Sequence, residues 1–228
     1  MKPKVIVFLM MVGLVSGCAH QLEVKNLHLY EASSLRTMPK NFSIGVSTNN
    51  TGGNGRTLVT GVANGLAKYT GNMVYPYNLN DSQKVDLIAK VAVKPEYNGS
   101  YWNFLINFPG FLFWVPAWNG YVYDSTYNVD IELIDGVDSS VISTFTMPIH
   151  MDIRHADMDR TWTEISWLEV GAIALIGGIW FIQYDTDVTP LLEREIKTPV
   201  GDYIAQEIAK RVTDAGFVQK VENRKAGI

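Results

Sequence analysis

Histidine and aspartate side chains that could bind a metal ion are densest between residues 150 and 159. Because side chains alternate between the two faces of a strand, His150 and Asp152 share one face. His155, Asp157 and Asp159 share the other face. A zinc site needs three or four ligands that converge on one point. We therefore interpret the cluster as a solvated strand end, with neighbouring Arg154 as an ion-pair partner, and expect no metal site.

A polar, glycine-rich turn at residues 49–56 lies between an expected strand and an expected helix, where nucleotide-binding proteins carry a phosphate loop. That loop needs a glycine at its first position and a lysine that reaches the phosphates. Asn50 and Arg56 stand in these two places. The turn therefore predicts an ordinary connection, although the backbone N–H groups that start the helix could bind an anion.

Sequence motifs of hydrolases are absent. The chain contains no Gly-x-Ser-x-Gly turn and no His-Glu-x-x-His segment. Paired carboxylates, such as Asp185 with Asp187 and Glu193 with Glu195, are explained by solvation. We therefore expect no catalytic residue and no cofactor, and we expect that the protein is not an enzyme.

Cys18 is the only cysteine, and the residues before it form an export signal. Two lysines within the first four residues precede an apolar run over residues 5–15, and Ser16 and Gly17 adjoin the thiol. A charged start, a short apolar core and a small-residue exit are typical of a cleaved signal peptide rather than a membrane span. The exported domain therefore has no intrachain disulfide available and must hold together by its core.

The segment Val15-Ser16-Gly17-Cys18 resembles the lipobox of bacterial lipoproteins. The resemblance implies a signal peptide over residues 1–17, cleavage before Cys18, and lipid, palmitate included, on the new N-terminus. Residues 18–40 are then a lipidated tether. Ala19 stands where an aspartate would imply retention in the inner membrane, so the resemblance implies the outer membrane, on its periplasmic side.

Composition limits the partners of the exported chain. The 228 residues are 47% hydrophobic and 18% charged, and the formal charge is −4. Loss of two lysines with the signal peptide makes the remainder more acidic. Such a chain does not bind nucleic acid or an anionic lipid surface by charge alone.

Hydrophobic periodicity predicts a single domain over residues 41–220, followed by a loose charged tail at 221–228. Alternating apolar residues predict strands over 42–48, 73–77, 86–93, 121–134 and 141–153, the last two as a hairpin. Helical spacing predicts helices over 58–69 and 200–215. The expected fold class is α+β, with a single mixed or antiparallel sheet and helices on one face.

The order of these elements loosely resembles the small α/β domains of bacterial envelope lipoproteins, such as the curli-secretion lipoprotein and the lipoprotein subunits of lipid-transport systems. The likeness depends on the lipobox, on residues 42–69 and on the strand that begins at Asp86. It includes no diagnostic motif, so it implies no functional residues.

Two apolar segments exceed what one sheet needs. An aromatic insert over residues 102–118 is interrupted by Pro109-Gly110 and cannot be one helix. An apolar helix is expected over residues 162–184, and it reaches the length of a bilayer span only by including Glu169. The candidate residues for an apolar interface or a ligand groove are Phe104, Phe108, Phe111, Trp114 and Trp118.

Three interpretations of these segments stay open. They could pack on each other as core, form an interface with partner subunits or a membrane protein, or enter the membrane or line an acyl-chain groove. The sequence thus predicts a lipid-anchored accessory or assembly component of the envelope, whose partners are the membrane and an envelope protein or further copies of the chain. The alternatives are a binding module for a lipid or other apolar ligand, and a membrane-inserting secretion or pore component.

Overall fold

The computed structural model describes residues 21–32, 38–39, 41–50, 53–78, 84–108, 110, 115–156, 179 and 182–227. Its strands are β1 (Gln21–Val24), β2 (Ser43–Ser47), β3 (Asn72–Val74), β4 (Leu87–Gly99), β5 (Tyr121–Asp135) and β6 (Val141–Ala156). Its helices are the 3-10 helix η1 (Leu27–Tyr30), α2 (Gly53–Leu66), α3 (Trp102–Asn107), α4 (Val115–Trp118), α7 (Val188–Asp214) and α8 (Phe217–Ala226).

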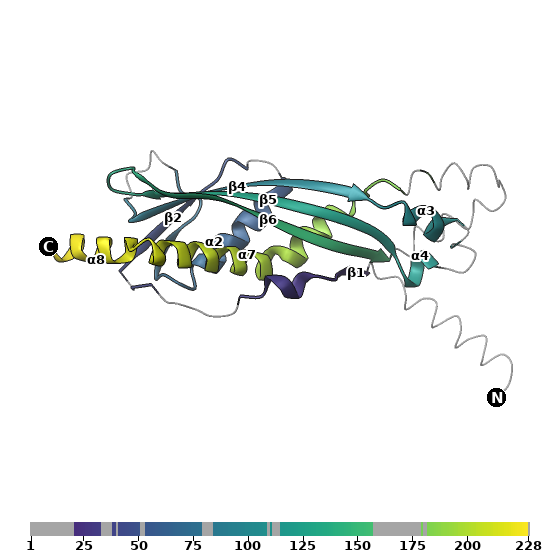
Figure 1. Cartoon of the computed structure of the whole chain (residues 1–228), viewed down its shortest axis with the longest axis horizontal. Coiled ribbons are helices and arrows are strands. Elements are labelled where there is room, and N and C mark those ends of the chain that lie inside the picture. The colour runs from purple at the N-terminus through teal and green to yellow at the C-terminus, as the bar shows by residue number, and fades with distance from the viewer. Residues whose placement is uncertain are drawn as a thin grey trace, which may run out of the picture. The chain divides into compact units, whose positions relative to one another are not determined.

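The strands form one mixed six-stranded sheet in the order β1-β6-β5-β4-β2-β3 (Figure 1). β2 runs parallel to both β3 and β4, whereas β1 runs antiparallel to β6. Strand β3 lies at an edge of the sheet, which suits Pro76 two residues after it, because a proline has no N–H to donate to a neighbouring strand. The predicted hairpin is confirmed: β5 and β6 are neighbours, and the Asp135 N–H donates to the Ser140 carbonyl across the turn (2.9 Å). The α+β class with a single mixed sheet is likewise confirmed.

Contacts divide the chain into two compact units. Unit 1 contains Met1–Lys25, Tyr97–Ser125 and Met151–Val188, and unit 2 contains Asn26–Glu96, Thr126–His150 and Thr189–Ile228. Strands β4, β5 and β6 run through both units.

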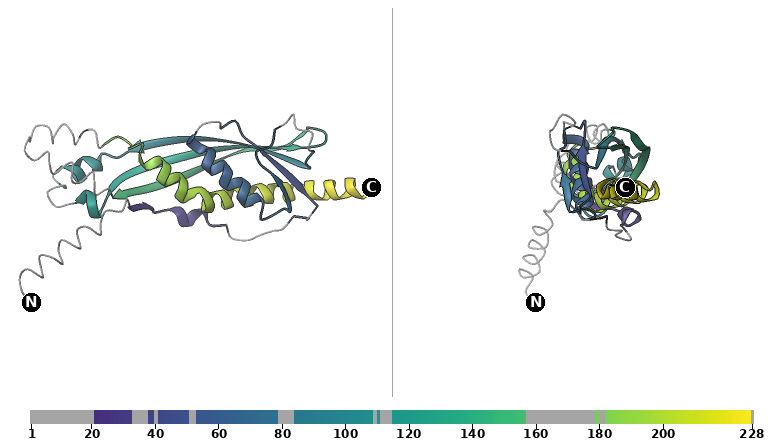
Figure 2. Two further views of the ribbon diagram at one scale, coloured as in Figure 1. Left: turned by 180° about the vertical axis from the view of Figure 1, so that it is seen from behind. Right: turned by 90° about the vertical axis from the view of Figure 1, so that its left-hand side faces the viewer.

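In unit 2, α2 and α7 cover one face of the sheet (Figure 2). Apolar side chains that alternate along the strands are buried, among them Ile44, Val46, Val91, Val129 and Leu133. The buried apolar residues of the helices include sets that are four residues apart: Leu58, Val62 and Leu66 on α2, and Ile204 and Ile208 on α7. This two-layer packing is the arrangement that the sequence predicts.

The two helices approach closely at a pair of glycines. A Cβ atom on Gly61 would lie 2.0 Å from the carbonyl oxygen of Lys197, and one on Gly201 would lie 2.4 Å from the carbonyl carbon of Gly61. Backbone therefore packs against backbone at this crossing. Both helices begin earlier than predicted: α2 at Gly53, inside the expected turn, and α7 at Val188, because buried Leu192 and Ile196 extend its apolar stripe.

The C-terminal residues are helical, so the prediction of a loose tail at 221–228 is wrong up to Ala226. Phe217 and Val221 of α8 are buried, and the Phe217 ring meets Phe42 edge-to-face at 6.2 Å. The charged side chains that suggested a solvated tail instead form ion pairs with aspartates of the sheet.

The predicted tether over residues 18–40 is also partly structured. β1 pairs with β6, and the Asn26 side chain after it donates to the His150 carbonyl oxygen (2.8 Å). A four-residue strand such as β1 carries no periodic signal of its own, so its partner strand decides its structure. The signal peptide and Cys18 lie outside the described residues.

Candidate functional site

The described members of the His/Asp cluster, His150, Asp152 and His155, lie on both faces of β6. His150 and Asp152 are exposed on one face of β6, as alternation predicts. His155 is buried rather than solvated, because it shares the core-facing side of β6 with Ile153. Asp157 and Asp159 lie outside the described residues. Within the described ranges, no three His, Cys, Asp or Glu side chains are placed to hold a metal ion.

Arg154, expected to pair with these carboxylates, donates instead to the side-chain oxygen of Asn119 (3.0 Å). Its guanidinium therefore fixes the turn before β5.

The start of α2 already has an anion beside it. Glu193 of α7 is buried, and its carboxylate accepts the Gly55 N–H at 2.7 Å. A carboxylate near a helix N-terminus is favourable. The position where an external anion could have bound is thus occupied by a side chain of the protein itself, and Glu193 is buried rather than solvated. In the same loop, the Asn50 amide pairs with both backbone groups of Val93, at 2.8 and 2.9 Å, so its role is structural.

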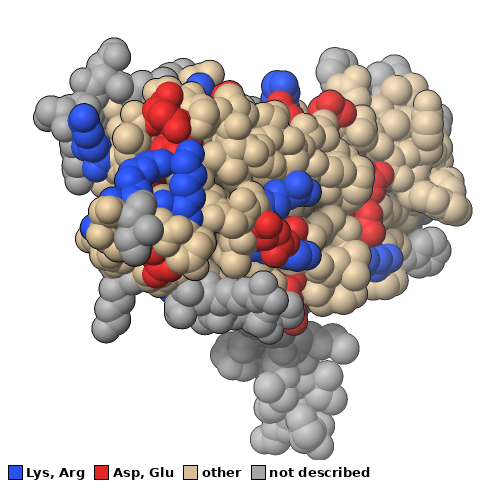
Figure 3. Space-filling view, turned by 60° about the vertical axis from the view of Figure 1, so that its left-hand side comes forward, with Lys and Arg blue, Asp and Glu red and all other residues tan. Residues whose placement is uncertain are grey.

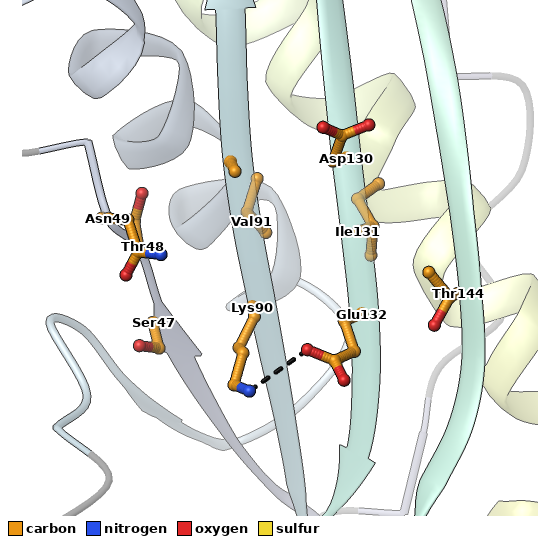
Figure 4. A pocket seen from close by; sticks show the side chains of 10 residues that line it. Ser47, Thr48, Asn49, Lys90, Val91, Asp130, Ile131, Glu132 and Thr144 are labelled. Carbon is orange, nitrogen blue, oxygen red and sulfur yellow. Dashed lines mark hydrogen bonds and ion pairs between the residues drawn. The ribbon is translucent and has the colours of Figure 1, made fainter.

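A shallow depression of about 300 Å³ lies on the polar face of the sheet in unit 2 (Figure 4). The Lys90 ammonium pairs with Glu132 at 3.1 Å inside it, and Lys94 pairs with Asp130 at 2.7 Å. Hydrogen bonds from Lys94 and Thr146 hold the pKa of Asp130 below its usual value.

The lowered pKa keeps Asp130 ionised and its hydrogen bonds keep it engaged, which makes it a poor proton acceptor, and the Glu132 carboxylate is already paired with Lys90. The lining side chains that the structure describes include hydroxyls but no histidine to activate them. Figure 3 shows the same intermingling of acidic and basic side chains over one face of the molecule. The residues that line the depression therefore do not assemble an acid–base pair.

The aromatic insert forms two short helices, α3 and α4, and α3 turns its polar side inward. Asn103 is buried, and its amide pairs with both backbone groups of Val122: it donates to the carbonyl (2.8 Å) and accepts the N–H (2.7 Å). Asn107 is buried one turn later and accepts a hydrogen bond from the Tyr121 hydroxyl (3.4 Å). Because these asparagines occupy the inner side, Trp102 and Leu105 face outward.

The exposed residues form what we call the aromatic surface, defined as Tyr101, Trp102, Leu105 and Trp118. Their exposed fractions are 85%, 67%, 50% and 69% respectively. Large apolar side chains that are exposed together are typical of a surface that contacts another protein, a membrane or a ligand.

The five residues predicted for an interface or groove differ in their exposure, and two of them are not described. Phe104 and Phe108 are half-buried and meet edge-to-face at 6.5 Å. Trp118 belongs to the aromatic surface, and Phe111 and Trp114 lie outside the described residues. Sequence reasoning missed Tyr101, Trp102 and Leu105. The sequence signal that could have found them is the spacing of Asn103 and Asn107, which lie one helical turn apart in an otherwise apolar segment. Two polar residues on one side of a short apolar helix indicate that this side makes hydrogen bonds and that the apolar residues lie elsewhere.

The second apolar segment lies outside the described residues at 162–178 and 180–181. At its end, Tyr184 stacks on Tyr97 at 4.5 Å and meets Tyr123 edge-to-face at 5.3 Å. Of the helices within the described ranges, none has the length and apolarity needed to cross a bilayer.

Comparisons with known proteins leave the family open. No protein-family model matches the chain, and neither does any curated protein. Solved structures with a similar course include the rare lipoprotein B of Shewanella oneidensis, with 12% identity, a TM-score of 0.39, and coverage of 75% of this chain and 97% of the other. A Xanthomonas campestris protein from a domain family of unknown function has 9% identity and a TM-score of 0.39, with coverage of 83% of this chain and 96% of the other.

The PelC dodecamer of Paraburkholderia phytofirmans gives 12% identity, a TM-score of 0.30, and coverage of 81% of this chain and 99% of the other. All three TM-scores are below 0.5, so these likenesses assign neither a family nor a role to this chain.

Proposed function

We propose that the protein is a lipid-anchored component of the bacterial cell envelope, with an accessory or assembly role at the periplasmic face of the outer membrane, and that it is not an enzyme. The observation that carries this proposal is the segment Val15-Ser16-Gly17-Cys18 behind a charged start and an apolar core. Ala19 after the cysteine supports the outer membrane by the same resemblance.

The assembly role is supported by the aromatic surface. Trp102 and Leu105 are turned outward by the buried asparagines, which suits contact with a broad apolar or interfacial surface. An enclosed acyl-chain groove would need apolar walls on several sides of the ligand. The outward direction therefore favours an interface with the membrane, an envelope protein or a further copy of the chain.

The lipid anchor is tested by Cys18→Ser in a bacterial host. We expect the wild-type chain to lose residues 1–17, to incorporate labelled palmitate, and to gain the mass of a lipidated N-terminus. The variant should keep its signal peptide and incorporate no label, because the modified atom is the cysteine sulfur. Intact mass spectrometry and radiolabelling measure both outcomes.

Ala19→Asp provides the matched control, since it leaves Cys18 in place. This variant should still be lipidated but should move from the outer to the inner membrane fraction of a sucrose gradient. A wild-type chain with an unmodified Cys18, or a Cys18→Ser chain that is normally processed and anchored, would contradict the proposal.

A further inference from the structure

The aromatic surface belongs to an uncharged part of the chain. No charged residue occurs from Tyr97 to Tyr123. Tryptophan and tyrosine favour the interface between lipid headgroups and hydrocarbon, where the ring is in an apolar layer and the polar atom stays hydrated. The charges that flank the stretch along the chain, Glu96 and Asp124, are both acidic, which disfavours anionic lipid. The nearby cation Arg154 is bonded to the side chain of Asn119. The chemistry fits a zwitterionic bilayer surface.

The start of the sheet and the aromatic surface lie at the same end of unit 1. In the β1–β6 pair, Gln21 lies opposite Ala156. A Cβ atom on Gly120 would lie 2.8 Å from the backbone nitrogen of Ala156. Gln21 and Gly120 therefore both adjoin Ala156, and paired strands are only about 5 Å apart. Trp118, in the aromatic surface, is two residues before Gly120.

Helix α3 is fixed to the same end. Asn103 bonds to the backbone of Val122, and Asn107 bonds to the hydroxyl of Tyr121. Tyr121 and Val122 are the first two residues of β5 and directly follow Gly120. The position of Trp102 and Leu105 is therefore set by the strand end that adjoins Ala156.

The chain between the anchor and the sheet is short. Cys18 precedes Gln21 by three residues, and three residues span at most about 11 Å when fully extended. A lipid on Cys18 thus enters the bilayer within that distance of the start of β1. The bilayer is then present at a high effective concentration beside the aromatic surface, before any other partner arrives.

We propose that the aromatic surface rests in the headgroup region of the same bilayer that holds the lipid on Cys18, as a second membrane contact. This inference depends on the proposed lipid anchor. A bilayer is favoured over a protein partner because the anchor delivers it to this end of unit 1 and because the surface presents tryptophan, tyrosine and leucine without charge.

The single cysteine makes a clean test possible. Lipid consumes Cys18, so Leu105→Cys introduces the sole free thiol into the full-length lipidated chain. The purified protein is placed in phosphatidylethanolamine–phosphatidylcholine vesicles and labelled with a nitroxide. Spin relaxation then reports collisions with dissolved oxygen, which concentrates in lipid, and with a nickel chelate, which stays in water. Val137→Cys is the matched control, because Val137 is also exposed and lies on the β5–β6 turn of unit 2.

We expect the label at position 105 to collide with the nickel chelate severalfold less, and with oxygen more, than the label at 137. Trp102→Cys should repeat the result at a second position. Equal nickel collision at 105 and 137, in protein that still floats with the vesicles, overturns the second contact and leaves the anchor intact. Shielding of 105 from both agents, with spin–spin broadening between copies, overturns it in favour of a chain–chain interface. Failure of the wild-type protein to float contradicts the anchor itself.

Discussion

At the scale of single residues, Asn103 decides which side of α3 faces out. Asn103→Leu keeps the size of the side chain but leaves the N–H and carbonyl of Val122 without their partner, at a cost of about 2–3 kcal/mol. We expect lower stability to urea and faster amide exchange over residues 102–107, measured by mass spectrometry. Asn128→Ala is the control, since Asn128 lies on β5, the strand that contains Val122, and its side chain donates to the exposed Glu96 at 3.3 Å. Unchanged exchange in α3 would contradict the positioning role.

Asp135 is the other residue whose removal has a defined consequence. Its side chain is fully buried, and it accepts hydrogen bonds from Arg224 (2.7 Å) and Lys220 (2.9 Å) of α8. Burial alone would raise the pKa of Asp135, but the bonds from Arg224, Lys220 and the Val137 N–H outweigh it and hold the pKa well below its usual value. Asp135→Asn should lower the free energy of unfolding by about 2 kcal/mol at neutral pH, because Arg224 and Lys220 keep access to water.

The sign of the pH effect follows from that lowered pKa. The stabilisation by Asp135 is complete above the pKa of the unfolded carboxyl, near 4, and is lost as the pH falls from there toward the lower folded pKa. The stability gap between the wild-type chain and Asp135→Asn should therefore narrow from pH 7 to pH 3, as followed by urea titrations. Asp138→Asn, which alters an exposed partner of Lys220, should show a smaller gap. A gap that does not depend on pH would rule out the ion-pair explanation.

At the scale of elements, the crossing of α2 and α7 depends on Gly61. Alanine is the better helix former by about 1 kcal/mol. At Gly61, however, its methyl group would lie 2.0 Å from a carbonyl oxygen of α7, and forcing the helices apart costs about 3 kcal/mol. The steric effect wins, so Gly61→Ala should lower the melting temperature clearly. Gly53→Ala has open space around its new methyl group and should be neutral or stabilising. A neutral Gly61→Ala would contradict the close packing.

The elements that could be predicted from the sequence are those with a local hydrophobic pattern. The strands were accessible because alternation over residues 121–134 is a local signal. Gly61 counts as a helix breaker by propensity, and only the partner helix shows why it is needed. Helix α8 was missed because Phe217 and Val221 are its few buried apolar residues, and its charges looked solvated until Asp135 supplied a partner.

At the scale of the whole molecule, the candidate site could be located from sequence but not oriented. The concentration of aromatic residues over 102–118 identified the segment. The direction of its side chains depends on the pairing of Asn103 with Val122, 19 residues away, which the aromatic residues do not indicate and which only the spacing of Asn103 and Asn107 suggests. Cys18 is the opposite case, because its signal is entirely local and needs no fold. The proposal therefore combines one feature that is read in the sequence with one that only the structure displays.

The early start of β1 has a consequence for how copies of this protein would meet. If the lipid on Cys18 and the aromatic surface both hold unit 1 in one bilayer, as proposed, tilting is restricted and rotation about the membrane normal is the main freedom left to unit 1. Neighbouring copies would then diffuse in the plane of the membrane, at the same distance from its surface and in the same orientation relative to it. Such molecules lose little further rotational entropy when they join side by side, so even a weak lateral contact could order them.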